Sequence, residues 1–137
     1  MGLILDSSVI IAAERRGETV EQLIARILRT TGDRDAALSA VGLTESVHGL
    51  YRAPAPEMRV RRESFLNELL ADLTVYPYTK EAALLAGKLD AEQQSRGVVI
   101  PFADLLIGAP ALALGYAVLT LNVRHFDRIP GLRVVKL

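Results

Sequence analysis

The sequence predicts an α/β fold, a single domain over residues 1–137 with a central parallel sheet of four to five strands and helices on both faces. Two observations support this prediction. Short apolar runs without polar alternation are typical of parallel strands that are covered on both faces. These runs alternate with amphipathic helical segments, which parallel strands need as crossover connections. A length of 137 residues and a hydrophobic content of 50% suit one core and exclude a disordered chain.

Periodicity and capping residues define the elements in order. Residues 3–5 predict a buried strand, and a helix is expected over residues 7–14. Thr19 and Gln22 have the spacing of a capping box, and the helix that they begin ends at Gly32. The remaining expected elements are a strand over 36–41, a helix over 45–51, a helix over 57–73, a strand over 75–76, a helix between Thr79 and Gly97, a helix from Phe102, a strand over 117–121 and an edge strand over 133–137.

Neither the N-terminus nor the longest uncharged stretch predicts a membrane or export segment. The apolar start is ended by Asp6 and is too short for a signal peptide. Residues 105–123 carry no charge, but Gly108, Pro110 and Gly115 interrupt them, so a buried helix followed by a strand is expected. A cytoplasmic protein is therefore expected. The absence of cysteine excludes thiolate nucleophiles and Cys-ligated metals, so any metal must be bound mainly by oxygen.

Three acidic residues, Asp6, Glu45 and Asp104, are expected at one edge of the sheet, where the parallel strands have their carboxyl ends. Asp6 follows the first strand, and the other two lie in the first turns of predicted helices. Thr120 and Asn122 end a strand at the same edge. Two interpretations stay open. Each acid caps a helix, or together they bind a cation, for which Mg²⁺ or Mn²⁺ suits hard oxygen ligands.

Four motifs carry a resemblance to a known family. They are LDSSVII at residues 5–11, TESVHGL at 44–50, FADLLIGA at 102–109 and LTLNVRHF at 119–126. In this order they resemble the motifs of PIN-domain ribonucleases, and most closely those of VapC-type toxins. The likeness spans residues 3–137 and includes the turn at 129–132 before the last strand.

The resemblance implies a metal-dependent endoribonuclease, the toxin of a type II toxin–antitoxin module. In such an enzyme Asp6, Glu45 and Asp104 would hold Mg²⁺ or Mn²⁺, which activates water for attack on a phosphodiester. Ser8 and Thr120 match polar positions that line these sites.

Asn122 also matches one of these polar positions, but there the sequence departs from the family, because many members have an acidic residue where Asn122 stands. One tightly held ion is therefore expected rather than two. Pro110 is a second departure, since it removes a backbone hydrogen bond inside the Asp104 helix.

The chain is neutral, with 16 basic and 16 acidic residues, but its charges are segregated. Residues 52–62 contain four arginines and one acid, and residues 124–136 contain four basic residues and one acid. Arg124, close to Asn122, is the candidate for binding an RNA phosphate. For the arginines of residues 59–62 a solvated face or a partner contact is the alternative. His125 is expected to fix the loop after its strand.

The resemblance also implies partners, namely an RNA substrate, a small cognate antitoxin and a second copy of the chain in a homodimer. The first two helices have more apolar residues than one core-facing stripe needs, so a groove between them is expected to accept an antitoxin helix. A cation of the antitoxin would then lie among Asp6, Glu45 and Asp104. The alternative is that these apolar residues are all buried against the sheet.

Two other functions remain as alternatives to the nuclease. Asn122 and Pro110 fit a PIN-like scaffold that binds a partner without catalysis. A phosphoacceptor receiver domain shares the alternating fold, but it needs adjacent acids after the first strand, and the segment from Asp6 to Ser8 has only one.

Overall fold

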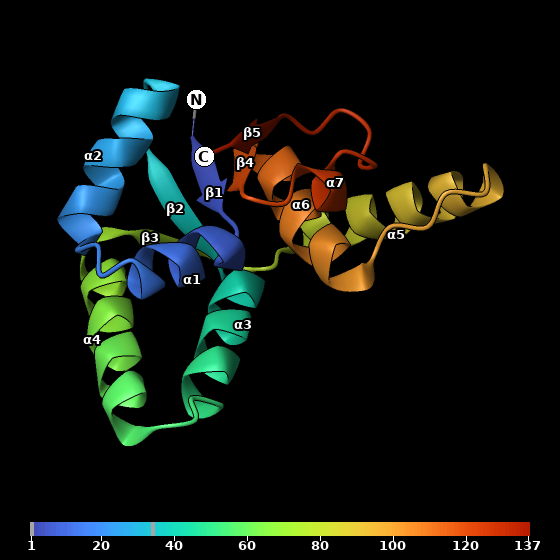
Figure 1. The fold of residues 1–137 in the computed structure, drawn as a ribbon. Helices are drawn as coiled ribbons and strands as arrows, with labels where there is room; N and C mark the ends of the chain where they lie inside the picture. The colour runs from blue at the N-terminus through green and yellow to red at the C-terminus, as the bar shows by residue number, and fades with distance from the viewer. Residues whose placement is uncertain (1, 34) are drawn as a thin grey trace.

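The five strands lie in the order β3-β2-β1-β4-β5 and all pair in parallel in the computed structural model of the protein (Figure 1). The structure describes residues 2–33 and 35–137. The strands are β1 (Leu3–Leu5), β2 (Ala36–Ser39), β3 (Thr74–Tyr76), β4 (Ala117–Thr120) and β5 (Val134–Lys136). The predicted α/β class and parallel sheet are confirmed.

Helices connect the strands and cover both faces of the sheet (Figure 1). They are α1 (Ser7–Arg15), α2 (Val20–Thr31), α3 (Ala40–Tyr51), α4 (Pro56–Asp72), α5 (Lys80–Ser95), α6 (Phe102–Leu114) and α7 (Val123–Phe126). The predicted capping box of α2 is present, and Gly32 ends that helix in the left-handed conformation at φ 75°. The short helix α7 was not predicted, because four residues show no periodicity.

Alternate side chains of β1 point into two separate cores. Leu3 and Leu5 pack with apolar side chains of α1, α2 and α4, whereas Ile4 packs with those of α5, α6 and α7. Both faces of the strand are thus buried, which explains why its sequence shows no polar alternation. In Figure 1, α1, α2 and α4 accordingly lie on one side of the sheet, with α5 and α6 on the other.

The expected surplus of apolar residues on α1 and α2 is wrong. Val9, Ile10, Leu23 and Ile27 are all buried in the first core. Ile11 is the exception on α1, with 41% of its surface exposed, and Leu28 on α2 is only half-buried. The alternative, in which the apolar residues of these helices pack against the sheet, therefore holds for most of them.

The uncharged stretch at 105–123 divides into the buried helix α6 and the strand β4, as expected. Helix α6 continues through Pro110 to Leu114, so this proline does not end the helix. No helix in the described residues is long and apolar enough to cross a membrane.

Gly108 allows α6 to pack closely on the segment that precedes β5. A Cβ at this position would overlap the end of the buried Ile129 side chain. We predict that Gly108→Ala lowers the free energy of unfolding by about 1–3 kcal/mol through overpacking. Gly87→Ala, at an exposed position of α5 with open space, is expected to raise it by about 0.5–1 kcal/mol. Urea denaturation of both variants measures the two changes in the free energy of unfolding. Equal changes would contradict the close packing at Gly108.

Candidate active site

Asp6 is the most firmly held of the three acidic residues. It follows β1, is 7% exposed, and its Oδ2 accepts hydrogen bonds from Ser8 Oγ at 2.7 Å and from Thr120 Oγ1 at 2.9 Å. The Ser8 hydroxyl also accepts from the backbone N–H of Leu121 at 3.1 Å. Because hydrogen bonds stabilise a buried carboxylate, Asp6 is fixed where β1 and β4 end side by side.

Glu45 lies in the second turn of α3, one turn later than expected. The helix begins directly after β2, and Ser39 caps it by accepting from the backbone N–H of Gly42 at 3.0 Å. Thr44, the predicted cap, instead donates to the Ala40 carbonyl inside the helix. Glu45 is therefore too far along α3 to cap it, and the helix-capping interpretation fails for this residue.

Asp104 lies in the first turn of α6, and no side-chain cap is formed there. Its Oδ2 is buried and has no hydrogen-bond partner. The ring of His125 approaches it, with Nδ1 3.4 Å from Oδ2, a distance longer than that of a good hydrogen bond. Asp104 thus has an unsatisfied buried oxygen that a cation would stabilise.

The three carboxylates influence one another although they come from different elements. Burial raises the pKa of Glu45 above its ordinary value, and the charge of Asp6 raises it further, while a hydrogen bond from Ser7 lowers it and Asp104 raises it again. Burial also raises the pKa of Asp104, His125 opposes this shift, and Asp6 adds to it. The net effect at both sites disfavours the charged form, so a bound cation would be stabilising.

These acids are close enough to interact but do not form a ready-made metal site. In residues 2–33 and 35–137, no three acidic or histidine side chains are near enough together to bind one ion as they stand. The donors nevertheless fit Mg²⁺ or Mn²⁺ chemically, because all are oxygens and one of them, Asp104 Oδ2, is buried without a partner.

The predicted supporting residues take different roles. Ser8 and Thr120 bind Asp6 directly. Asn122 contributes its backbone N–H to Thr120 Oγ1 at 2.9 Å, while its side chain is exposed. His125, which was expected only to fix a loop, approaches Asp104. No local sequence signal could have found this contact, because it joins residues 104 and 125, which are far apart in the chain.

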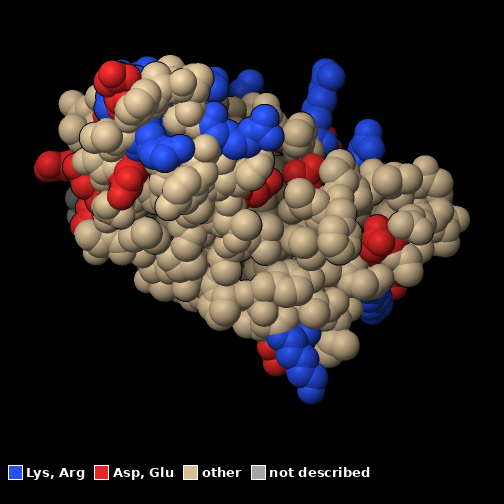
Figure 2. All heavy atoms as spheres, turned by 90° about the horizontal axis from the view of Figure 1, so that it is seen from below, with Lys and Arg blue, Asp and Glu red and all other residues tan. Residues whose placement is uncertain are grey.

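Basic side chains lie on both sides of the acidic edge. Figure 2 shows acidic atoms in the middle of this face, with groups of Lys and Arg to either side. Several arginines are bound by the protein itself. Arg62 donates to the Gly49 carbonyl at 2.9 Å and lies 3.8 Å from Glu14, and Arg59 lies 5.4 Å from the ring centre of Tyr51. These contacts within the chain are neither the solvated face nor the partner contact that was given as the alternative to RNA binding.

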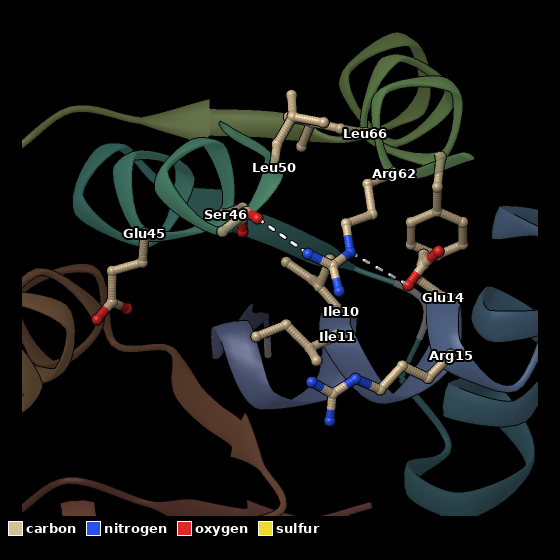
Figure 3. A pocket seen from close by; sticks show the side chains of 11 residues that line it. Ile10, Ile11, Glu14, Arg15, Glu45, Ser46, Leu50, Arg62 and Leu66 are labelled. Carbon is tan, nitrogen blue, oxygen red and sulfur yellow. Dashed lines mark hydrogen bonds and ion pairs between the residues drawn. The ribbon is translucent and has the colours of Figure 1, made fainter. Parts of the chain in front are cut away.

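A cavity of about 150 Å³ lies between α1, α3 and α4 (Figure 3). Its apolar lining is formed by Ile10, Ile11, Leu50, Phe65 and Leu66. Glu45 lies at one end, and the Glu14–Arg62 pair lies at the other (Figure 3). The hollow next to the acids is thus on the α3 and α4 side of α1, rather than between α1 and α2.

Comparison with known proteins identifies the family of the fold. The PIN-domain family model matches residues 3–132, which include all three acids. The chain belongs to the PIN-domain family. All four motifs lie within the matched residues, and the receiver-domain alternative is excluded.

Within the family the chain belongs with the VapC proteins. Ribonuclease VapC1 from Rickettsia felis is 32% identical over 135 residues, 98% of this chain and 96% of that protein. A tRNA(fMet)-specific endonuclease VapC from Salmonella typhimurium is 32% identical over 97 residues, 71% of each chain. The crystal structure of DNA-bound VapBC from Salmonella typhimurium superposes with a TM-score of 0.82 at 27% identity, covering 99% of this chain and 98% of that one.

The raised pKa of Glu45 has a consequence for stability. The folded protein binds a proton at Glu45 more tightly than the unfolded chain does, so this group lowers stability as pH rises from its ordinary pKa through its raised folded value. Below that window the penalty is absent. We predict that Glu45→Gln raises the melting temperature in EDTA, and that the gain is larger at pH 7 than at pH 4.

Thermal melts at both pH values measure this difference. Glu68→Gln, at an exposed position of α4, controls for the loss of one negative charge. A gain from Glu45→Gln that is the same at both pH values would contradict the electrostatic account of the site.

Proposed function

We propose that this protein is a metal-dependent endoribonuclease and the toxin of a type II toxin–antitoxin module. The observation that carries the proposal is the group formed by Asp6, Glu45 and Asp104. They lie at the carboxyl edge of the sheet, where burial and the charge of Asp6 raise the pKa of Glu45 and of Asp104, and a buried oxygen of Asp104 is left without a partner. The names of the VapC relatives support RNA as the substrate. An RNA substrate in turn favours the cytoplasm as its place of action.

The roles of the residues follow from their geometry. Asp6, fixed by two hydroxyl groups, provides the rigid ligand, while Glu45 and Asp104 complete the oxygen donors for Mg²⁺ or Mn²⁺. The ion, when bound, would activate water and neutralise charge on the leaving oxygen. Ser8 and Thr120 orient Asp6, and His125 limits the movement of the Asp104 carboxylate. Asn122 offers a neutral amide in place of a charge, which favours one ion over two.

A scaffold without catalysis is the second candidate function. It is favoured by one observation, that no three acidic or histidine side chains in the described residues stand close enough to bind an ion without rearrangement. Cleavage of RNA that requires the acids separates the two functions.

Asp104 is the acid whose replacement tests the metal site most directly. We predict that Mn²⁺ raises the melting temperature of the wild-type protein, because a ligand of the folded state stabilises it by about 2.7 kcal/mol when its free concentration is about 100 times Kd. Asp104→Asn is expected to remove this shift and to abolish RNA cleavage, while preserving the fold. EDTA is expected to stop cleavage by the wild-type protein.

Asp127→Asn provides the matched control, since Asp127 is exposed at the end of α7. Melting curves with and without Mn²⁺ and cleavage of tRNA are the measurements. Cleavage that persists in EDTA, or in Asp104→Asn, would refute the site.

The α1/α3/α4 cavity is the proposed site for a small cognate antitoxin. Some solved structures with this fold, such as the one from Salmonella typhimurium, are of VapBC. The cavity ends at Glu45, so a chain seated in it reaches the acids, where an Arg or Lys of the antitoxin would replace the metal electrostatically. Apolar side chains line most of the cavity, which suits a buried side chain of a partner.

Ile11 is the accessible apolar residue of this cavity. We predict that Ile11→Asp weakens the complex with the antitoxin without reducing RNA cleavage, because it places a charge in the apolar lining. Val60→Asp, on α4, is the control, because Val60 is exposed and does not line the cavity. Co-purification after co-expression with the product of the neighbouring gene measures the effect. Equal binding by both variants would place the antitoxin elsewhere.

A homodimer is the second proposed assembly. Leu84, Val99 and Phe102 are the most exposed large apolar residues around α5 and the start of α6, with 63–69% of their surfaces accessible. Exposed apolar groups of this kind mark contact surfaces. We predict that Leu84→Asp shifts the protein from dimer to monomer in light scattering. A wild-type protein that is monomeric at high concentration would contradict the dimer.

A further inference from the structure

An open hollow of about 390 Å³ lies beside the carboxylates, between α7 and the end of β5. We name it the α7–β5 hollow. Its polar lining consists of Asn122, Arg124, His125 and Lys136. Two permanent cations, an imidazole and an amide face this space, and no carboxylate side chain is among its lining residues in the described part of the chain. The hollow is therefore suited to an anion.

Its two cations are free to bind a ligand. Arg124 and Lys136 form no ion pair or hydrogen bond with another side chain within residues 2–33 and 35–137. Other arginines, by contrast, have internal partners. Arg26 forms two hydrogen bonds to Glu18, and Arg128 donates to the Val99 carbonyl at 2.9 Å. A ligand that binds Arg124 and Lys136 thus displaces no internal interaction.

The hollow shares its wall with the candidate active site. His125 lines it, and Nδ1 of the same ring lies 3.4 Å from Asp104 Oδ2. On the other side, the backbone N–H of Asn122 binds Thr120 Oγ1, which donates to Asp6. The wall of the hollow therefore includes His125, a residue that also approaches an acid of the candidate active site.

We propose that the α7–β5 hollow binds the RNA phosphate next to the one that is cut. This inference rests on the proposed ribonuclease function. Three carboxylates repel the polyanionic backbone of RNA, and a metal ion offsets this repulsion only at the scissile phosphate. Arg124 and Lys136 offset it one phosphate further along the strand. The guanidinium of Arg124 can donate two parallel hydrogen bonds to phosphate oxygens, whereas Lys136 acts as a point charge.

The two cations should affect binding rather than the chemical step, since the adjacent phosphate keeps its charge throughout the reaction. Arg124→Ala is therefore expected to raise KM about tenfold with kcat nearly unchanged. Lys136→Ala should act in the same direction. The control is Arg133→Ala, because Arg133 precedes β5 at the opposite end of that strand and does not line the hollow.

A binding measurement without cleavage keeps this inference separate from the nuclease proposal. Fluorescence anisotropy of a labelled single-stranded RNA, in EDTA and in Ca²⁺, gives Kd as a function of salt. Each lost phosphate contact lowers the slope of log K against log salt by about 0.7 for a single strand. We expect this decrease for Arg124→Ala and Lys136→Ala, and not for Arg133→Ala. If the salt dependence changes as expected but the wild-type protein does not cleave RNA, the nuclease proposal is refuted and the RNA-binding site is retained.

An RNA with one uncharged methylphosphonate next to the cleavage site locates the contact. At one of the two neighbouring positions, the neutral linkage should weaken binding to the wild-type protein and remove the further effect of Arg124→Ala. Independent effects at both positions would overturn the proposal. So would variants that bind RNA normally but lose the antitoxin, because the hollow would then bind a carboxylate of that partner.

Discussion

The hydrogen bond from Thr120 to Asp6 is the contact on which the geometry of the site depends. It joins the end of β4 to the end of β1, and Ser8 and the backbone N–H of Asn122 bind to the same small network. Asp6 thereby becomes a fixed point, and its negative charge raises the pKa of the two other acids. Without these hydroxyl donors a buried carboxylate at this edge would be costly and poorly positioned.

The chain has no net charge, but its acidic and basic side chains lie in separate groups at this edge. The acids occupy the middle of the carboxyl edge, and basic groups stand on both sides (Figure 2). The two basic groups differ in character, however. On the α4 side Arg62 is bound to Glu14 and to a backbone carbonyl, so its charge is partly compensated. On the α7 side Arg124 and Lys136 have no such partners in the described residues. The two sides of the edge therefore differ in how far their positive charges are compensated.

The sequence was sufficient to predict most of the fold, because buried parallel strands and capped helices have strong local signals. It also predicted that the three acids lie near one another, since strand ends of a parallel sheet converge. It placed the start of α3 too late, because Ser39 suits both a strand and a helix cap and Thr44 offered a competing cap. The approach of His125 to Asp104 joins segments 21 residues apart. The burial of Ile10 and Ile27 depends on how distant helices and strands pack in the first core, so neither feature has a local signal.

Glu45 is one of the interacting acids and is also part of the wall of the α1/α3/α4 cavity. Under the proposed function, a molecule in the cavity would therefore change the solvation and freedom of a group that would also bind a cation. Thermodynamic linkage makes this effect reciprocal. If a molecule in the cavity weakens cation binding by some factor, the cation weakens binding of that molecule by the same factor. Through this residue, the availability of metal would set how readily a partner is released from the protein.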